Sequence, residues 1–195
     1  MKALGSGADV NVRIPKMSTC FWELMSTFPS GVAVVTTIDD EGRPFGLTCS
    51  SLCSASLEPP LLLVCMDNRS RTLETILVRR IFAVNFLHSG GREAADLFST
   101  GAPNLFERIP WELTAVGALP SLFLHAHRVA GCTVRESRVA GDHTVIVGEV
   151  TEVTLLTATA PLLYGLRQYT AWPGSAPDQR PAGPSLPSGV EGRLR

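Results

Sequence analysis

The apolar residues of the chain fall mostly in short runs that lack a helical period. Several runs are rich in β-branched residues, and Gly, Pro, Asp or Asn bounds most of them, which is typical of strands joined by turns. The segment "DDEG" has the composition of a hairpin turn between two such runs. The pattern predicts strands at 31–38, 43–52, 61–66, 81–87, 122–135, 143–156 and 162–172.

Three segments have features of helices instead. In the first, apolar residues at positions 21, 22, 24, 25 and 28 indicate a short amphipathic helix, with Ser18 as N-cap and Pro29 beyond its end. In the second, Ser70 is placed to cap a helix that follows a buried strand. The sequence predicts helices at 17–28, 71–80 and 91–98.

The order of these elements predicts the fold class. Strict strand–helix–strand alternation is absent, and "GSGADV" near the N-terminus lacks the third Gly and the preceding strand of a dinucleotide-binding Rossmann motif. About six strands joined by short turns, with two or three helices, favour a mainly β protein in which helices flank a barrel. We expect a single domain at 17–173 between a flexible N-terminal arm (1–16) and a disordered Pro/Gly-rich tail (174–195).

Composition excludes several classes of partner. The formal net charge is −1 with no block of like charge, so neither nucleic acid nor an anionic membrane is an expected partner. No run reaches the eighteen apolar residues of a membrane span, and the N-terminus lacks the apolar core of a signal peptide. The five cysteines have no zinc-site spacing, so we expect reduced thiols, no metal site and a cytoplasmic protein.

The first segment that could carry chemistry is "GLTCSSLCSAS" at 46–56. The adjacent hydroxyls of Ser50 and Ser51 break the alternation of a strand, which indicates a bulge or a bend. Backbone N–H groups and hydroxyls at such a bend suit a flat ligand rich in acceptors, such as the pyrimidine edge of a flavin ring. The alternative is a polar edge strand.

The second segment is "CMDNRSRTLETI" at 65–76, where a strand ends and Ser70 begins a helix. The N-terminus of a helix has unpaired N–H groups and a positive dipole end, so it suits a phosphate. Arg69 and Arg71 flank the cap and could add charged donors. The alternative is an ordinary helix cap without a ligand.

Two further polar positions adjoin strongly apolar strands. Asn85 lies within "IFAVNFL", where its amide must have its hydrogen bonds satisfied, by neighbouring backbone or by a ligand. Asp142 precedes His143 at the start of "HTVIVGEV" and could hold one ring nitrogen, which would fix the tautomer of the imidazole. The alternative for this pair is a polar strand end. No GxSxG segment is present to support a hydrolase triad.

Taken in order, these segments resemble the flavin reductase family, from about Phe21 to Trp172. The resemblance implies a split β-barrel with a Greek-key arrangement (an FMN-binding fold) and a homodimer that binds FMN or FAD near the subunit interface. It is carried by "FPSGVAVVTT", "GLTCSSLCSASLEPPLLLVC", "DNRSRTL", "FAVNFL", "LFST", "GCTV", "GDHTVIVGEV" and "PLLYGLRQY".

The resemblance also implies roles for particular residues. Those expected along the flavin ring are Thr48, Cys49, Ser50 and Ser51, and those expected near the ribityl phosphate are Asn68, Ser70, Arg71 and Thr72. Ala83 and Asn85 are expected on the other side of the flavin, and His143 matches the histidine that faces the nicotinamide nucleotide. Leu52 stands where the family usually has an aromatic residue, and Cys49 where a small or polar residue is common.

The function implied is reduction of free FAD or FMN by NADH, or less favourably NADPH, with hydride passing from nicotinamide C4 to flavin N5. The reduced flavin would supply a flavin-dependent monooxygenase component. His143 would then position the nicotinamide and act neither as acid nor as base. The alternative is a non-catalytic flavin-binding or redox-sensing module. Pyridoxamine phosphate oxidase chemistry is disfavoured because Lys2 and Lys16 are the only lysines.

Overall fold

The computed structural model describes residues 16–157 and 159–172. The predicted tail and nearly all of the predicted arm lie outside these residues. The elements in chain order are α1 (Met17–Ser26), β1 (Ser30–Gly31), β2 (Ala33–Ile38), β3 (Pro44–Cys49), β4 (Leu52–Leu57), β5 (Pro60–Asp67), α2 (Arg71–Arg79), β6 (Ile81–Leu87), α3 (Arg92–Ser99), the 3₁₀ turn η1 (Leu105–Glu107), β7 (Glu112–Leu113), β8 (Pro120–Ser121), β9 (Ala126–Ala140), β10 (His143–Leu155), β11 (Leu162–Gly165) and β12 (Gln168–Ala171).

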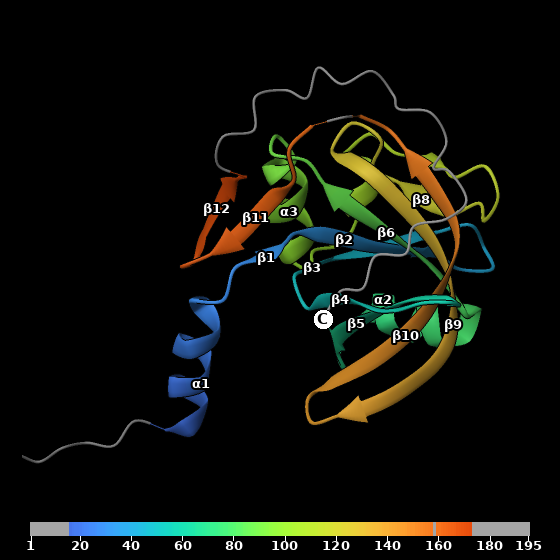
Figure 1. Ribbon diagram of the computed structural model, residues 1–195. Coiled ribbons are helices and arrows are strands. Elements are labelled where there is room, and N and C mark those ends of the chain that lie inside the picture. Colours follow the sequence, from blue (N-terminus) through green and yellow to red (C-terminus); the bar gives the residue numbers. More distant parts are fainter. Residues whose placement is uncertain (1–15, 158, 173–195) are drawn as a thin grey trace, which may run out of the picture.

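A seven-stranded antiparallel sheet in the order β3-β2-β6-β9-β10-β5-β4 forms most of the molecule (Figure 1). Its longest pair is the β9–β10 hairpin, which turns at Gly141 with a positive φ of 68°. Two register shifts bend this hairpin, one of them at Gly148, where the ring of Phe82 leaves no room for a Cβ atom. The prediction of a mainly β protein with flanking helices is confirmed.

The two edge strands of this sheet converge at one corner. Strand β3 ends at Cys49 and β4 begins at Leu52 on the opposite edge, so only Ser50 and Ser51 connect the two edges. Three peptide steps span at most about 11 Å, which means that the sheet curls strongly. The backbone N–H of Cys65 in β5 donates to the Ser51 carbonyl at 3.0 Å, which extends the β4–β5 pairing up to the corner. The described strands form an open sheet without a ladder between β3 and β4, so closure as a split barrel stays a prediction.

Strand β2 is buried on both faces, because α2 and α3 cover opposite sides of the sheet. Ala33 and Val35 pack in the cluster that contains Leu73 and Ile76 of α2. The alternate residue Val34 packs instead in a second cluster, with Ala95 and Phe98 of α3 among its members. This two-sided burial explains why the segment reads as a continuous apolar run and not as an alternating one.

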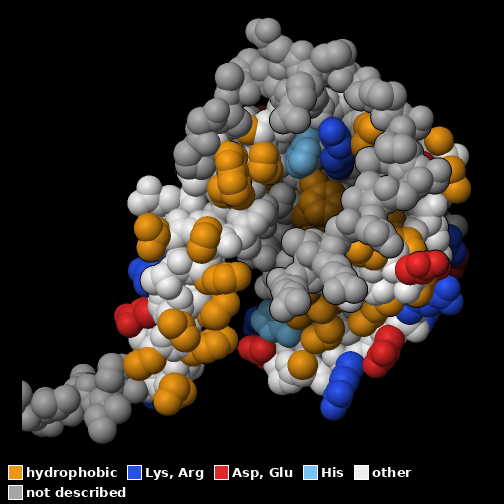
Figure 2. Space-filling model, viewed as in Figure 1, with side chains coloured by type: hydrophobic (Ala, Val, Ile, Leu, Met, Phe, Trp, Pro, Cys, Tyr) orange, Lys and Arg blue, Asp and Glu red, His pale blue; other side chains and the backbone are white. Residues whose placement is uncertain are grey.

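Helix α1 projects from the body of the protein and has no buried residue (Figure 1). Its apolar side chains gather along one side (Figure 2), and Phe21 and Leu24 are each more than 60% exposed. The end of the helix is held by the β11–β12 turn, where the Leu166 N–H donates to the Ser26 carbonyl at 2.6 Å. Because the helix begins at Met17, Ser18 lies within its first turn, and its prediction as the N-cap was wrong.

Three predicted strands are divided in the structure. The segment 31–38 contains the end of β1 and all of β2, with Val32 between them. The segment 43–52 is interrupted at the corner described above, and the segment 162–172 reverses at Leu166 and Arg167, which both have positive φ values. Within the described ranges, no helix has the length and apolar character needed to cross a membrane.

Candidate active site

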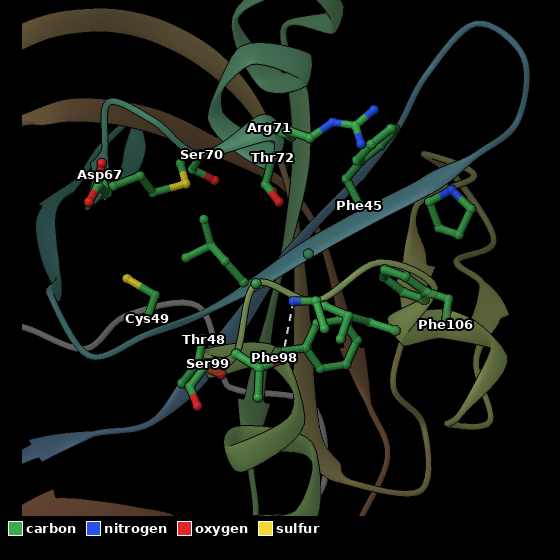
Figure 3. Close-up of a pocket in the computed structure, with 18 of the residues that line it drawn as sticks. Phe45, Thr48, Cys49, Asp67, Ser70, Arg71, Thr72, Phe98, Ser99 and Phe106 are labelled. Atoms are coloured by element: carbon green, nitrogen blue, oxygen red, sulfur yellow. Dashed lines mark hydrogen bonds between the residues drawn. The ribbon is translucent and has the colours of Figure 1, made fainter.

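A cavity of about 1520 Å³ opens at the corner where the sheet edges converge (Figure 3). Its walls come from β3, the Ser50–Ser51 link, the end of β5, the start of α2 and the segment from Phe98 to Glu107. A cavity for one drug-sized ligand is usually about 300–1000 Å³, so this one has room for more than one ring system.

The predicted ring-binding residues of β3 and its end all line this cavity. The hydroxyls of Ser50 and Ser51 have no hydrogen-bond partner among the described residues, which leaves them free for a ligand. Thr48 differs, because its hydroxyl donates to the Ala95 carbonyl at 2.7 Å and so ties β3 to α3. Burial raises the pKa of the Cys49 thiol to about 11, so this thiol presents a neutral surface.

The start of α2 forms another wall of the cavity. Ser70 is the N-cap, and its side chain accepts from the Leu73 N–H at 3.4 Å, as predicted for a helix cap. Thr72 is only 4% exposed, and Figure 3 shows its hydroxyl directed into the cavity, where no described residue pairs with it. The guanidinium of Arg71 lies beside this turn, 5.5 Å from the centre of the Phe45 ring. Unpaired N–H groups, a free hydroxyl that faces the cavity and an Arg together suit a phosphate.

Arg69 differs from Arg71 because a carboxylate already neutralises it. Its Nε and Nη2 donate to Asp67 at 3.0 and 2.7 Å. The hydrogen bonds from Arg69 hold the pKa of Asp67 well below its usual value, so the pair remains ionised. Of the two arginines that flank the cap, Arg71 is therefore the one available to a phosphate.

Asn68 does not line the cavity, and its expected place near a phosphate stays a prediction. Its backbone N–H donates to the Asp142 carbonyl at 3.0 Å, and its side-chain amide donates to the Gly141 carbonyl at 3.1 Å. Its amide oxygen accepts from the Thr144 hydroxyl at 2.8 Å. These three bonds clamp the turn of the β9–β10 hairpin against the end of β5, so Asn68 fixes the turn that bears His143.

His143 lines the cavity opposite Asp67, its register partner on β5. Its Nδ1 lies 2.8 Å from Asp142 Oδ1, and hydrogen bonding to the imidazole lowers the pKa of the Asp142 carboxyl. An ionised Asp142 places the ring proton on Nδ1 and leaves Nε2 free to accept from a ligand when the ring is neutral. The imidazole is 45% exposed, which leaves it accessible from the cavity.

Ala83 and Asn85 do not line the cavity, and their expected place beside a flavin stays a prediction. Ala83 is buried within β6. The amide nitrogen of Asn85 donates to the Val34 carbonyl and the Thr36 hydroxyl, each at 3.1 Å, and its oxygen accepts from the Leu122 N–H at 2.8 Å. The protein itself satisfies this buried amide, as the structural alternative required.

Sequence reasoning missed the aromatic wall of the cavity. The rings of Phe98, Phe106 and Trp111 form a chain of edge-to-face contacts, with centres 5.0 and 5.5 Å apart. Tyr164 and Tyr169, with ring centres 5.1 Å apart, close the cavity near β11 and β12. Aromatic residues in the irregular segment 101–111 were the available signal, but they show no period that a strand or helix pattern could reveal.

An open antiparallel sheet with one large cavity, a neutral wall and the start of a helix suits a nucleotide that has a flat ring and a phosphate. The unpartnered hydroxyls of Ser50, Ser51 and Thr72 are available to such a ligand. Residues 25–173 match the flavin reductase like domain model, and the chain belongs to this family.

Named relatives agree with this membership. The chain is 49% identical over 149 residues to the flavin reductase (NADPH) of Lentzea aerocolonigenes, covering 76% of this chain and 86% of that protein. It is 40% identical over 154 residues to the flavin reductase (NADH) of Kitasatospora aureofaciens, covering 78% and 81%. Among solved structures it resembles the NADH:FAD oxidoreductase SgcE6 of Streptomyces globisporus C-1027 in complex with NAD and FAD fragments, with a TM-score of 0.76, 29% identity and coverage of 86% and 98%.

Proposed function

We propose that this chain is an NAD(P)H:flavin oxidoreductase that reduces FAD or FMN and releases the product to a flavin-dependent monooxygenase component. The observation that carries the proposal is one cavity holding two complementary sets of free donors. Ser50 and Ser51 offer hydroxyls at the sheet corner, and the first turn of α2 offers unpaired N–H groups and the Thr72 hydroxyl. A flavin nucleotide carries an acceptor-rich neutral ring and a phosphate, so it matches both sets.

The nicotinamide supplies a hydride and the flavin accepts it, so the hydride transfer is chemistry of the two nucleotides themselves. The protein contributes geometry. Holding the two rings in contact at about 3–3.5 Å, with the correct faces together, lowers the entropic contribution to the activation free energy of hydride transfer. The thiol of Cys49 is neutral in this wall and offers no competing nucleophile. We assign His143 to the nicotinamide nucleotide, with Asp142 holding its tautomer and Asn68 holding its turn.

The identity of the nicotinamide nucleotide is the finer part of the proposal. We propose NADH as the preferred donor on the basis of the family resemblance. The relatives include proteins named for NADPH and for NADH, so their names support NAD(P)H in general. Steady-state turnover with each nucleotide at equal concentration decides between them.

We also propose a homodimer with the split-barrel form of this family. Helix α1 supports the dimer, because its exposed apolar side is large for a monomer surface, and a second copy of the chain would cover it. The convergence of β3 and β4 at Ser50 and Ser51 supports the barrel form. The five cysteines of the protein are free thiols, which agrees with the proposed cytoplasmic location.

Turnover separates this function from a non-catalytic flavin-binding module. Purified protein mixed with NADH and a large excess of FAD or FMN should give steady loss of absorbance at 340 nm, at a rate proportional to protein concentration. A binding module would quench flavin fluorescence and show at most one stoichiometric reduction. That second result would reject the enzyme.

A further inference from the structure

A second, smaller cavity of about 390 Å³ adjoins the large one. Tyr164 and Tyr169 line both, so their rings form the border between the two spaces. Beyond this border the walls are mostly polar and come from α3 and from the β11–β12 turn. The remaining lining residues are Arg92, Asp96, Arg167 and Gln168.

The charge of this smaller cavity is positive. Arg167 follows Leu166 in a turn where both residues have positive φ values, and its guanidinium lies 3.8 Å from the centre of the Trp22 ring. No carboxylate of the described residues forms an ion pair with it. Arg92 has a weak partner, since its Nε is 3.3 Å from Asp96 and both side chains are more than half exposed. Two guanidinium groups therefore face one carboxylate.

Two of the three arginines that line the large cavity already form ion pairs. Arg69 is bound to Asp67, and Arg43 is paired with Asp39 at 2.7 Å and also with Glu41. Arg71 lies at the start of α2, where the flavin phosphate is proposed to bind. A further phosphate on a ligand that extends past the tyrosine pair would reach Arg92 and Arg167 as the next cations.

We propose that Arg92 and Arg167 bind a phosphate group on the adenosine half of a dinucleotide held in the large cavity. This inference rests on the proposed function, which places flavin and nicotinamide nucleotides in that cavity. FAD, NADH and NADPH each carry such a half, whereas FMN lacks it. Guanidinium groups bind phosphate oxygens through paired, charge-assisted hydrogen bonds, and bound phosphate would replace Asp96 beside Arg92.

The test compares the wild-type protein with the double variant Arg92→Gln/Arg167→Gln. Dissociation constants for FAD and FMN come from fluorescence titration, and Michaelis constants for NADH and NADPH are measured with FMN as acceptor. In the double variant we expect the dissociation or Michaelis constant of the ligand whose phosphate the arginines bind to rise about tenfold or more, because charge-assisted hydrogen bonds are lost. FMN binding should change less than about twofold, and Arg92→Lys/Arg167→Lys should restore most of the affinity.

Three controls isolate the phosphate contact. Arg135→Gln removes an arginine that is paired with Glu149 on the hairpin and lines neither cavity, so it should change no constant. Trp22→Leu removes the ring beneath Arg167 and keeps its charge. Asp96→Asn removes the competing carboxylate, and binding of the same ligand should tighten.

The pattern of losses identifies the source of the phosphate. If the dissociation constant for FAD rises and that for FMN does not, the two arginines bind the FAD pyrophosphate. If only the Michaelis constant for NADPH rises, they bind its 2′-phosphate. If the Michaelis constants for NADH and NADPH rise equally, they bind the pyrophosphate of these nucleotides. The inference is overturned if no constant changes more than about twofold, or if FMN weakens as much as FAD. The FAD and FMN titrations need no turnover, so the flavin arm distinguishes failure of this inference from failure of the proposed enzyme activity.

Discussion

The hydroxyl of Thr72 faces the cavity and has no hydrogen-bond partner among residues 16–157 and 159–172. A hydroxyl without a protein partner makes no hydrogen bond that stabilises the empty protein, but it is free to bond a ligand. Two measurements therefore distinguish a ligand-binding residue from a structural one: the stability of the variant without ligand, and its affinity for the ligand.

Thr72→Val is the sharpest substitution for this purpose. Valine has nearly the same shape and no hydroxyl, so the empty protein should keep or slightly raise its melting temperature while FMN binds about tenfold more weakly. Thr37→Val is the matched control, because the buried Thr37 hydroxyl donates to the Ile81 carbonyl at 2.8 Å. That control should lose about 1 kcal/mol of stability and keep its FMN affinity. A Thr72 variant that behaves like the control would refute the phosphate site.

His143 should act on the nicotinamide nucleotide alone. His143→Ala removes about one hydrogen bond, which predicts a Michaelis constant for NADH higher by roughly twofold to tenfold. Its dissociation constant for FMN should stay within about twofold of the wild-type value. Steady-state kinetics and a flavin titration measure the two quantities. If flavin affinity collapses while the Michaelis constant for NADH is unchanged, His143 has been assigned to the wrong nucleotide.

Cys49 gives the protein a pH dependence in alkaline solution. Burial raises its folded-state pKa to about 11, so the folded protein keeps the thiol neutral where the unfolded chain ionises it. Its contribution is fully present below the unfolded pKa near 9 and is lost as the pH rises towards 11. Cys49→Ala should therefore lose less stability between pH 8 and pH 10.5 than the wild-type protein, by urea unfolding. Cys53→Ala, at an exposed position, should show the wild-type slope.

At the scale of elements, the β9–β10 hairpin carries His143 but depends on Asn68 for its position. Asn68→Ala removes the side-chain bonds to Gly141 and Thr144, and the turn should then hold the imidazole less precisely. We expect the Michaelis constant for NADH to rise several-fold, with flavin affinity unchanged. Double-mutant kinetics with His143→Ala test this coupling, because a positioning role predicts effects that do not add. Additive effects would mean that Asn68 acts independently of His143.

The order and type of the elements could be predicted from the sequence because each run has its own period and its own boundary residues. Ser70 was recognisable as an N-cap, and the Ser50–Ser51 pair marked an interruption of a strand. Asn85 was ambiguous, since its apolar neighbours show that it needs partners but not which groups supply them. The hydrogen bonds of Asn68 could not be foreseen for a related reason, because its partners Gly141 and Thr144 lie more than seventy residues away in the chain.

At the scale of the whole molecule, the path of the chain around the sheet creates the site. No local pattern shows that β3 and β4 are opposite edges of one sheet or that Tyr164 and Tyr169 border the cavity. These facts follow from long-range pairing, which depends on the complete set of strands. The resemblance to a family could supply the general location of the ligand, whereas the aromatic wall and the arginine-lined cavity required the coordinates.

The exposed side of α1 makes an assembly prediction at this scale. Phe21→Glu/Leu24→Glu places two charges on that side, and burial of each apolar side chain is worth about 1.5–3 kcal/mol. Light scattering should show the mass of two chains for the wild-type protein and of one chain for the variant at micromolar concentration. Thr19→Glu, on the opposite side of the helix, should remain a dimer. A wild-type protein with the mass of one chain would reject the homodimer.

The two-residue link at Ser50 and Ser51 has a consequence for how easily the two edges of the sheet separate. The opposing margins of the curled sheet meet there along a seam with no backbone ladder between the described residues of β3 and β4, and a ligand bound in the corner would contact both margins. Occupancy would then suppress local opening, so amide hydrogens near the seam should exchange more slowly when flavin is present. Release of the product would again allow local opening at this seam, so each turnover would be coupled to opening and closing of the sheet edges.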